Sequence, residues 1–454
     1  MHPLAPTPAW GRPVTNFPEP DFIPTPLDGR IAGPERSVRS NIAAKMAALG
    51  AARPEEQMPH FLTDEQKAIR DTARKFAQKE VRPRGVEIDV EDRVPEDLVK
   101  RCKELNFFGL FISPKYGGLG ADLTTTCLVL EEIAKEAPGF AGLLNVEMVL
   151  CPRSVELLGT EAQKQKYLAP SAKGERLLAW SQTEPSGAGN ILAHQTRLTP
   201  DGDGYRLNGL KIFSSQGTAR NYLVMARTSR NGQEGYGCAI VEQEWPGFKV
   251  AKYEDKLGWR GTNTGTVMFT DVYVPKENIL GDLLTGNHDI GVANQVSFAG
   301  HAATSLGCLE GMFERTLEYV KQRNLYGAPA WQLQPISYWL ADVYTKIEAC
   351  RSLLYTATRV LPTEGKRGWD EGSISGLYGS MCKAYIGDIA AQGTDTLLKM
   401  WGGSGIMNST GVNRYAREAR TKIVAEGTTE MHLTIVASSL LGQGGFISSA
   451  SSKQ

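Results

Sequence analysis

One short segment near the C-terminus combines a carboxylate with residue types that would hold it in place. Glu426 follows the apolar trio Ile423-Val424-Ala425 and precedes Gly427, which permits backbone angles that other residues avoid. The two threonines that follow are natural caps for a helix expected over 430–441. The pattern predicts a bent connection between two helices, with Glu426 as a candidate general base. Burial would raise its pKa, and the next helix N-terminus would oppose that rise. A solvated or helix-capping glutamate is the alternative.

Composition excludes several classes of function. The 454 residues include 50 basic and 50 acidic side chains, so the net charge does not indicate a nucleic acid or an anionic membrane surface as partner. No apolar run approaches the length that a bilayer requires. The seven cysteines lack a Cys-x-x-Cys pair and are expected to be free thiols in a reducing compartment. The six dispersed histidines show no metal-ligand spacing, so no metal site is expected.

The two ends of the chain differ from the rest. Residues 1–60 are rich in proline and lack the apolar centre of a signal peptide. We interpret them as an extended arm on the surface or across a subunit boundary, with a mobile tail as the alternative. Residues 442–454 are expected to be a polar tail.

In the remaining chain, the spacing of apolar residues changes twice. Residues 61–174 have helical spacing and open with the capping-box pattern Thr63-x-x-Gln66. Residues 175–289 carry hairpin signals and alternating strands, which predict an antiparallel β domain. Longer helical patterns return over 290–441, so the fold class is α+β. Helices are expected over 96–105, 123–134, 141–158, 160–168, 299–322, 333–360, 372–400, 413–424 and 430–441, and strands around 205–207, 222–226, 237–241, 248–252 and 266–274.

The glycine clusters do not indicate a nucleotide-binding Rossmann fold. Gly117-Gly118-x-Gly120 and Gly402-Gly403-x-Gly405 are not placed between a strand and a helix of a βαβ unit. The sequence also lacks a P-loop and a Gly-x-Ser-x-Gly elbow.

Nine short motifs, in this order, resemble those of the acyl-CoA dehydrogenase family over residues 61–441. They are Leu62-Thr63-Asp64-Glu65-Gln66, Tyr116-Gly117-Gly118-Leu119-Gly120, Thr183-Glu184-Pro185, Leu207-Asn208-Gly209-Leu210-Lys211-Ile212-Phe213, Lys256-Leu257-Gly258-Trp259-Arg260, Val274-Pro275, Arg323 with Tyr326-Gly327, Gly402-Gly403-Ser404-Gly405 and Glu426-Gly427-Thr428. The resemblance implies an N-terminal helical domain, a central antiparallel β domain and a C-terminal four-helix bundle.

The resemblance also implies FAD as the cofactor. The flavin ring would lie against 180–183 and 213–215, with Ser215 near flavin N5, and the adenine and pyrophosphate end would be held partly by a neighbouring subunit. The guanidinium group of Arg323 could donate two hydrogen bonds to a phosphate. The alternatives are that Arg323 only ends a helix, where a cation is favourable, and that Gln334 is a surface amide. The implied cofactor-binding residues are Trp180, Gln182, Thr183, Phe213, Ser215, Arg323, Gln334, Lys399, Gly402, Gly403, Thr428 and Glu430.

By the same resemblance, Glu426 removes the proton next to a thioester carbonyl while hydride leaves the next carbon for flavin N5. Some relatives carry this base near 295–299, but that stretch holds no carboxylate here. The implied substrate-binding residues are Gly189, Ala425 and Gly427.

Some positions depart from the family pattern. The run Ser186-Gly187-Ala188-Gly189-Asn190 lacks the usual serine and aspartate, which leaves contacts to the FAD diphosphate and to CoA open. Lys399 stands where a glutamine is usual. Ala425 replaces a tyrosine of several relatives, which predicts room for a bulky, branched or cyclic acyl group.

The resemblance implies an acyl-CoA substrate, an electron-transfer flavoprotein as acceptor and a homotetramer built as a dimer of dimers, with no nucleic acid or membrane span. The expected location is the cytoplasm, or the mitochondrial matrix in a eukaryote. Two alternatives stay open. The first is other flavin chemistry on this fold, such as an acyl-CoA oxidase, a desulfinase-like enzyme or a monooxygenase. The second is a non-catalytic assembly or binding protein.

Overall fold

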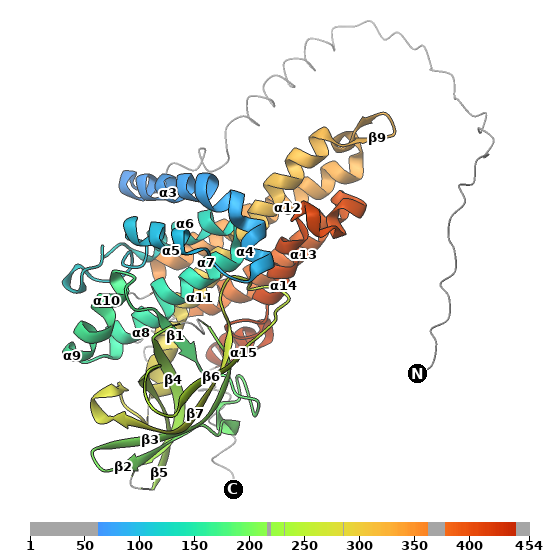
Figure 1. The fold of residues 1–454 in the computed structure, drawn as a ribbon. Coiled ribbons are helices and arrows are strands. Elements are labelled where there is room, and N and C mark those ends of the chain that lie inside the picture. The colour runs from blue at the N-terminus through green and yellow to red at the C-terminus, as the bar shows by residue number, and fades with distance from the viewer. Residues whose placement is uncertain (1–61, 216–218, 231, 285, 362–376, 442–454) are drawn as a thin grey trace, which may run out of the picture. The chain divides into compact units, whose positions relative to one another are not determined.

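The computed structural model describes residues 62–215, 219–230, 232–284, 286–361 and 377–441. Both the arm expected over 1–60 and the tail expected over 442–454 lie outside these residues. Within the described chain, helices come first, a sheet follows, and longer helices complete the fold (Figure 1). The expected α+β class with a central, mainly antiparallel sheet is therefore confirmed.

The N-terminal part begins at the expected capping box. Thr63 Oγ1 accepts from Gln66 N at 3.1 Å, and Gln66 Oε1 accepts from Thr63 N at 2.9 Å. This exchange satisfies two backbone donors at the start of the first helix. The α-helices are α3 (Asp64–Phe76), α4 (Gly85–Glu91), α5 (Glu96–Glu104), α6 (Leu123–Ala134), α7 (Pro138–Asn145), α8 (Cys151–Leu158), α9 (Glu161–Gln163) and α10 (Ala169–Ala172).

Short π-helical turns interrupt this part of the chain: η1 (Ala77–Val81), η4 (Val146–Leu150) and η5 (Lys164–Leu168). Each ends two residues before a proline, and these prolines are Pro83, Pro152 and Pro170. A proline has no N–H, and its ring clashes with the carbonyl four residues earlier, so a widened turn accommodates it. The single helix expected over 141–158 is therefore α7, η4 and α8 in succession.

The central sheet is antiparallel in most of its pairings. Its strands are β1 (Leu178–Ser181), β2 (Arg197–Asp201), β3 (Gly204–Ser214), β4 (Asn221–Arg230), β5 (Gln233–Glu242), β6 (Phe248–Tyr253), β7 (Gly265–Pro275) and β8 (Ile279–Leu280). The order is β6-β7-β3-β2-β4-β5-β8, and β1 pairs with β4. The β1–β4 and β2–β4 pairings are parallel, which the hairpin signals did not predict. Side chains mainly from β4, β5 and β7 form the buried hydrophobic core of the β region.

The C-terminal helices are α11 (Gly286–Gln322), α12 (Gln334–Val360), α13 (Tyr378–Trp401), α14 (Asn413–Lys422) and α15 (Thr429–Leu440), with a small hairpin of β9 (Asn324–Leu325) and β10 (Ala328–Pro329) after α11. α11 begins at Gly286, well before the expected residue 299. It packs against α6 and α7 of the N-terminal part and against α12, α13 and α14. This position makes α11 the central element of the helical region.

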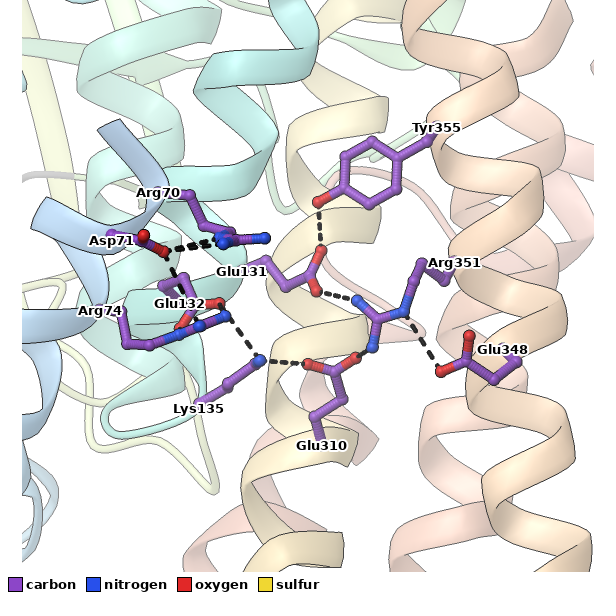
Figure 2. A network of polar contacts seen from close by, with 10 residues as sticks. All are labelled: Arg70, Asp71, Arg74, Glu131, Glu132, Lys135, Glu310, Glu348, Arg351 and Tyr355. Atoms are coloured by element: carbon purple, nitrogen blue, oxygen red, sulfur yellow. Dashed lines mark hydrogen bonds and ion pairs between the residues drawn. The ribbon is translucent and has the colours of Figure 1, made fainter. Parts of the chain in front are cut away.

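A buried network of charges joins α3, α6, α11 and α12 (Figure 2). Arg351 of α12 donates to both Glu131 of α6 and Glu310 of α11. Lys135 Nζ lies 2.9 Å from a Glu310 oxygen and 3.3 Å from a Glu132 oxygen. Because an unpaired buried charge is costly, these contacts fix the position of α11 against its neighbours.

All seven cysteines lie in the described chain, and each is buried and unpaired, which confirms the expected free thiols. Within the described ranges, no group of three or more metal-binding side chains is found. None of the helices described has the length and apolar character needed to cross a bilayer.

Candidate active site

Glu426 lies on a bent connection between α14 and α15, as the sequence predicts. Its φ is +56° and that of Gly427 is +97°, a region that favours glycine. Thr428 caps α15 by accepting from Met431 N at 3.3 Å. Lys383 of α13 donates to Gly427 O and, at 3.1 Å, to Ile423 O. A lysine, a cap and a glycine therefore hold the strained turn that presents Glu426.

Three side chains from other helices surround the Glu426 carboxylate. Asn145, the last residue of α7, donates Nδ2–H to Oε1 at 3.1 Å. Ser297 of α11 donates its hydroxyl to Oε2 at 3.0 Å. His301, one turn further along α11, places Nδ1 3.5 Å from Oε1. The Glu426 side chain keeps 12% of its surface exposed.

The pKa of Glu426 corrects the expectation from its apolar sequence neighbours. Burial raises this pKa, but His301, Ser297 and Asn145 together lower it below the ordinary value. The sequence neighbours of Glu426 are apolar, whereas its spatial neighbours are polar groups from α7 and α11. The carboxylate is therefore ionised at neutral pH and able to accept a proton.

A loop of the β region closes the far side of His301. The Trp259 ring stacks on the His301 ring with centroids 5.3 Å apart, and Lys422 Nζ lies 4.5 Å from the Trp259 ring centroid. Trp259 N–H donates to Glu418 of α14. A side-chain carbon at Gly258 would lie 2.5 Å from Thr421 Oγ1, so only glycine permits this close approach. The loop thus anchors the β region on α14.

The two segments expected to hold the flavin ring lie side by side. Trp180 and Ser215 form an antiparallel bridge, and Ile212 N donates to Thr183 O at 2.9 Å. Lys211 Nζ donates to Gln182 O at 2.8 Å. Phe213 adopts a φ of +57° and leaves 59% of its surface exposed. β1 also packs against η4, which begins directly after Asn145, so this strand edge is connected to the Glu426 site.

The residues expected at the adenine and pyrophosphate end gather at the far end of the helical bundle. Arg323 and Gln334 are both exposed, and Arg323 O accepts from Ala330 N at 2.7 Å just before α12. The Tyr319 and Trp401 rings stack at 4.1 Å, which joins the ends of α11 and α13. This stack brings the exposed residues Lys399, Gly402 and Gly403 to the same end. Figure 1 shows β9, which follows Arg323, far from the sheet. One chain therefore does not bring this group to its own Trp180 edge.

The remaining predicted residues lie around the start of α15. Gly189 is exposed, and a side-chain carbon there would lie 3.5 Å from Met431 Sδ. His194 fixes this loop by donating Nε2–H to Gly187 O at 2.9 Å. Ala425 is half-buried, and Thr428 and Glu430 are exposed. The loop that departs from the family pattern thus lies beside Met431, in the first turn of α15.

Sequence reasoning missed the side chains that hold Glu426: Asn145, Ser297, His301, Lys383 and His432. Two signals were available. Asn145 is a polar residue within an apolar helical run, and Ser297 lies in the stretch 295–299, where the family resemblance places the alternative base. A polar residue on a buried helix face requires a partner, which is a search criterion in its own right.

Comparison with known proteins agrees with this architecture. Models of the acyl-CoA dehydrogenase N-terminal, middle and C-terminal domains match residues 63–175, 179–272 and 296–441. The short-chain specific acyl-CoA dehydrogenase of Clostridium acetobutylicum is 32% identical over 84% of this chain and 99% of its own. The cyclohex-1-ene-1-carbonyl-CoA dehydrogenase of Syntrophus aciditrophicus is 33% identical over 84% of this chain and 91% of its own. The structure of butyryl-CoA dehydrogenase from Megasphaera elsdenii has a TM-score of 0.79 and 34% identity, and the match covers 85% of this chain and 100% of that one.

The fold and the buried carboxylate define a flavoprotein oxidoreductase. The chain belongs to the acyl-CoA dehydrogenase family, and its cofactor is FAD. The described residues fit this group. The Trp180–Ser215 edge offers an exposed aromatic ring and backbone groups, and a side-chain carbon at Gly402 or Gly403 would meet no atom within 4 Å. The open glycine turn leaves room for a diphosphate to approach the backbone.

Proposed function

We propose that the protein dehydrogenates an acyl-CoA thioester between its α and β carbons, with Glu426 as the general base. The observation that carries this assignment is the Glu426 carboxylate itself. It is ionised, held on a strained turn and stabilised by donors from α7 and α11. Backbone strain of this kind is typical of functional sites, where one side chain must keep a fixed orientation.

Each residue of the site has a role that follows from its position. Glu426 takes the proton from the α carbon, while Asn145 and Ser297 hold its two oxygens in a fixed orientation. The bound flavin supplies the acceptor for the hydride that leaves the β carbon. Trp180, Phe213 and Ser215 provide the surface and the polar edge for the flavin ring.

We propose a bulky, branched or cyclic acyl group as the substrate. Ala425 precedes the base and carries only a methyl group. A relative with 33% identity is named for a cyclic substrate, cyclohex-1-ene-1-carbonyl-CoA. A small residue next to the base leaves volume where a ring of the substrate would lie.

The proposed assembly is a homotetramer, a dimer of dimers, with electron-transfer flavoprotein as the electron acceptor. It is supported by the separation of the two groups of FAD residues within one chain and by exposed aromatic side chains at the far end of the bundle. The unpaired thiols suit the cytoplasm, where reducing conditions keep them free.

An anaerobic titration tests the function. The purified flavoprotein is mixed with straight, branched and cyclic acyl-CoAs, and the flavin absorbance is followed. Bleaching by one class is expected, with the bulky class reduced fastest. Glu426→Gln should slow bleaching by about 10²–10⁴-fold, whereas the remote Glu104→Gln serves as the matched control. A flavoprotein that no thioester bleaches would contradict the proposal, and rapid reoxidation by oxygen would identify an oxidase.

A further inference from the structure

His301 makes two polar contacts that together define its protonation. Its Nε2 lies 3.0 Å from Lys422 O, and a carbonyl oxygen only accepts, so Nε2 carries a hydrogen. Its Nδ1 faces Glu426 Oε1 at 3.5 Å. The side chain is fully buried. In the neutral ring, Nδ1 therefore points a lone pair at a carboxylate oxygen.

Two lone pairs that face each other in a buried site repel unless one proton lies between them. Nδ1 has no hydrogen-bond partner among the described residues, so no other group relieves the repulsion. One proton added to the pair satisfies both atoms, either as a carboxylic acid that donates to Nδ1 or as an imidazolium that donates to Oε1. Asn145 and Ser297, by contrast, only donate to Glu426 in this arrangement.

The surroundings of His301 limit the pair to one proton. Lys422 of α14 and Lys383 of α13 are the cations that act on the ring, and Glu426 is the opposing anion. Trp259 covers one ring face and brings no charge. Burial and the two lysines lower the pKa of His301, while Glu426 raises it. A second proton would give the pair a net positive charge beside two lysines, which is unfavourable.

We propose that His301 is a proton-sharing positioning residue, and that the proton removed from the acyl chain is held between Glu426 Oε1 and His301 Nδ1. This inference rests on the proposed role of Glu426. In the step, the α C–H bond breaks and its electron pair forms the new C=C bond. Hydride leaves the β carbon for the flavin, so the acyl chain is oxidised by two electrons and the flavin is reduced by two. The α proton stays with the pair.

The first test does not require turnover. Histidine labelled with 13C between the ring nitrogens is followed by NMR in the flavoprotein, and His301→Leu assigns the signal. In the wild type the His301 signal should titrate at a pH below that of an ordinary histidine, keep this step in Ser297→Ala and lose it in Glu426→Gln. A signal that does not titrate in the wild type, or that titrates equally in Glu426→Gln, would overturn the proposal without affecting the function.

The second test uses the direction of a shift in the pH profile of flavin bleaching. Ser297→Ala removes a donor to the anion, so its inflection should move to higher pH. Because His301 lowers the pKa of Glu426, His301→Leu and His301→Asn should also move the inflection to higher pH. An unchanged inflection in the two His301 variants would show a merely structural histidine. A variant that loses flavin gives no bleaching profile, and the NMR titration then tests the proposal.

Discussion

At the scale of single residues, the site depends on side chains that hold the backbone of Glu426 as much as on those that hold its carboxylate. His432 Nε2 donates to Glu426 O at 3.1 Å, and Lys383 donates to the carbonyls of Ile423 and Gly427. These bonds satisfy carbonyls between α14 and α15 that are not part of the hydrogen-bond pattern of either helix. The positive φ of Glu426 persists because several groups determine it together.

Lys383→Met should therefore impair catalysis through position. The variant leaves two half-buried carbonyls without a donor and frees the turn to shift. We expect the maximal rate of flavin bleaching to fall by about 10–100-fold while FAD content stays within error of the wild type. Lys346→Met removes a half-buried lysine of α12 that pairs with Asp342, far from Glu426 in the chain, and should bleach at the wild-type rate. A Lys383→Met enzyme with full activity would show that the other contacts suffice.

His432 predicts part of the acid sensitivity of the protein. Burial, with the nearby Lys383, lowers its pKa to about 3, whereas a histidine in the unfolded chain titrates near 6.5. Between these values the unfolded state binds more protons, so the free energy of unfolding falls as pH falls through this window. The expected loss from pH 7 to 5 is about 2 kcal/mol.

His432→Leu should flatten this part of the pH dependence, although it lowers stability at neutral pH by removing the bond to Glu426 O. The measurement is the difference in Tm between pH 7 and pH 5 for wild type and variant at equal FAD content. Equal differences would show that His432 is protonated alike in both states.

At the scale of elements, local signals and long-range contacts differ in what they reveal. The capping box of α3, the bounds of α6 and the start of α12 follow from residues a few positions apart, and the sequence predicts them closely. The π turns before Pro83, Pro152 and Pro170 were missed because a proline inside a helical pattern also permits a kink or an end. The parallel pairings of β4 depend on connections that hairpin rules do not describe.

The difference between local signals and long-range contacts also explains which parts of the site the sequence predicts. The turn at Glu426 follows from its own Gly and Thr neighbours, so the sequence predicts it. Asn145 and Ser297 lie 281 and 129 residues from Glu426 along the chain, and only the packing of α7 and α11 brings them to it. Polar residues on helix faces give no local sign of their partner. The sequence shows the effect of burial on the pKa of Glu426 but not the donors from α7 and α11 that lower it.

The charge network around Arg351 should account for much of the stability of the helical region. Arg351→Met leaves Glu131 and Glu310 buried without their shared cation, and the pKa of Glu131 is already raised to about 7 by burial and by Glu310. We expect a loss of about 3–5 kcal/mol.

The matched control lies on the same helix. Lys346 forms an exposed pair with Asp342, so Lys346→Met should cost less than about 1 kcal/mol. Urea unfolding followed by circular dichroism compares the two variants. Similar midpoints would show that the network contributes no more than a surface pair.

At the scale of the whole molecule, the residues proposed to bind FAD lie in two groups that one chain does not bring together. The flavin edge at Trp180 lies on the sheet, and the group around Arg323 and Gly402 lies at the far end of the bundle (Figure 1). Exposed aromatic residues surround that end: Tyr326 is 96% exposed, Tyr338 63% and Trp331 46%. We propose that a second copy of the chain covers this exposed aromatic patch.

A charge placed in this patch should therefore affect assembly and cofactor together. Tyr338→Glu puts a carboxylate on the exposed face of α12, beside Gln334, whose amide donates to the Tyr338 hydroxyl at 2.5 Å. A buried unpaired carboxylate costs several kcal/mol at an interface, so the proposed tetramer should dissociate. If the partner chain completes the adenine site, FAD should be lost in parallel. Mass photometry and the ratio of flavin to protein absorbance measure the two effects, and Tyr273→Glu on the sheet is the control. A Tyr338→Glu protein that dissociates yet keeps its FAD would place the whole cofactor site within one chain.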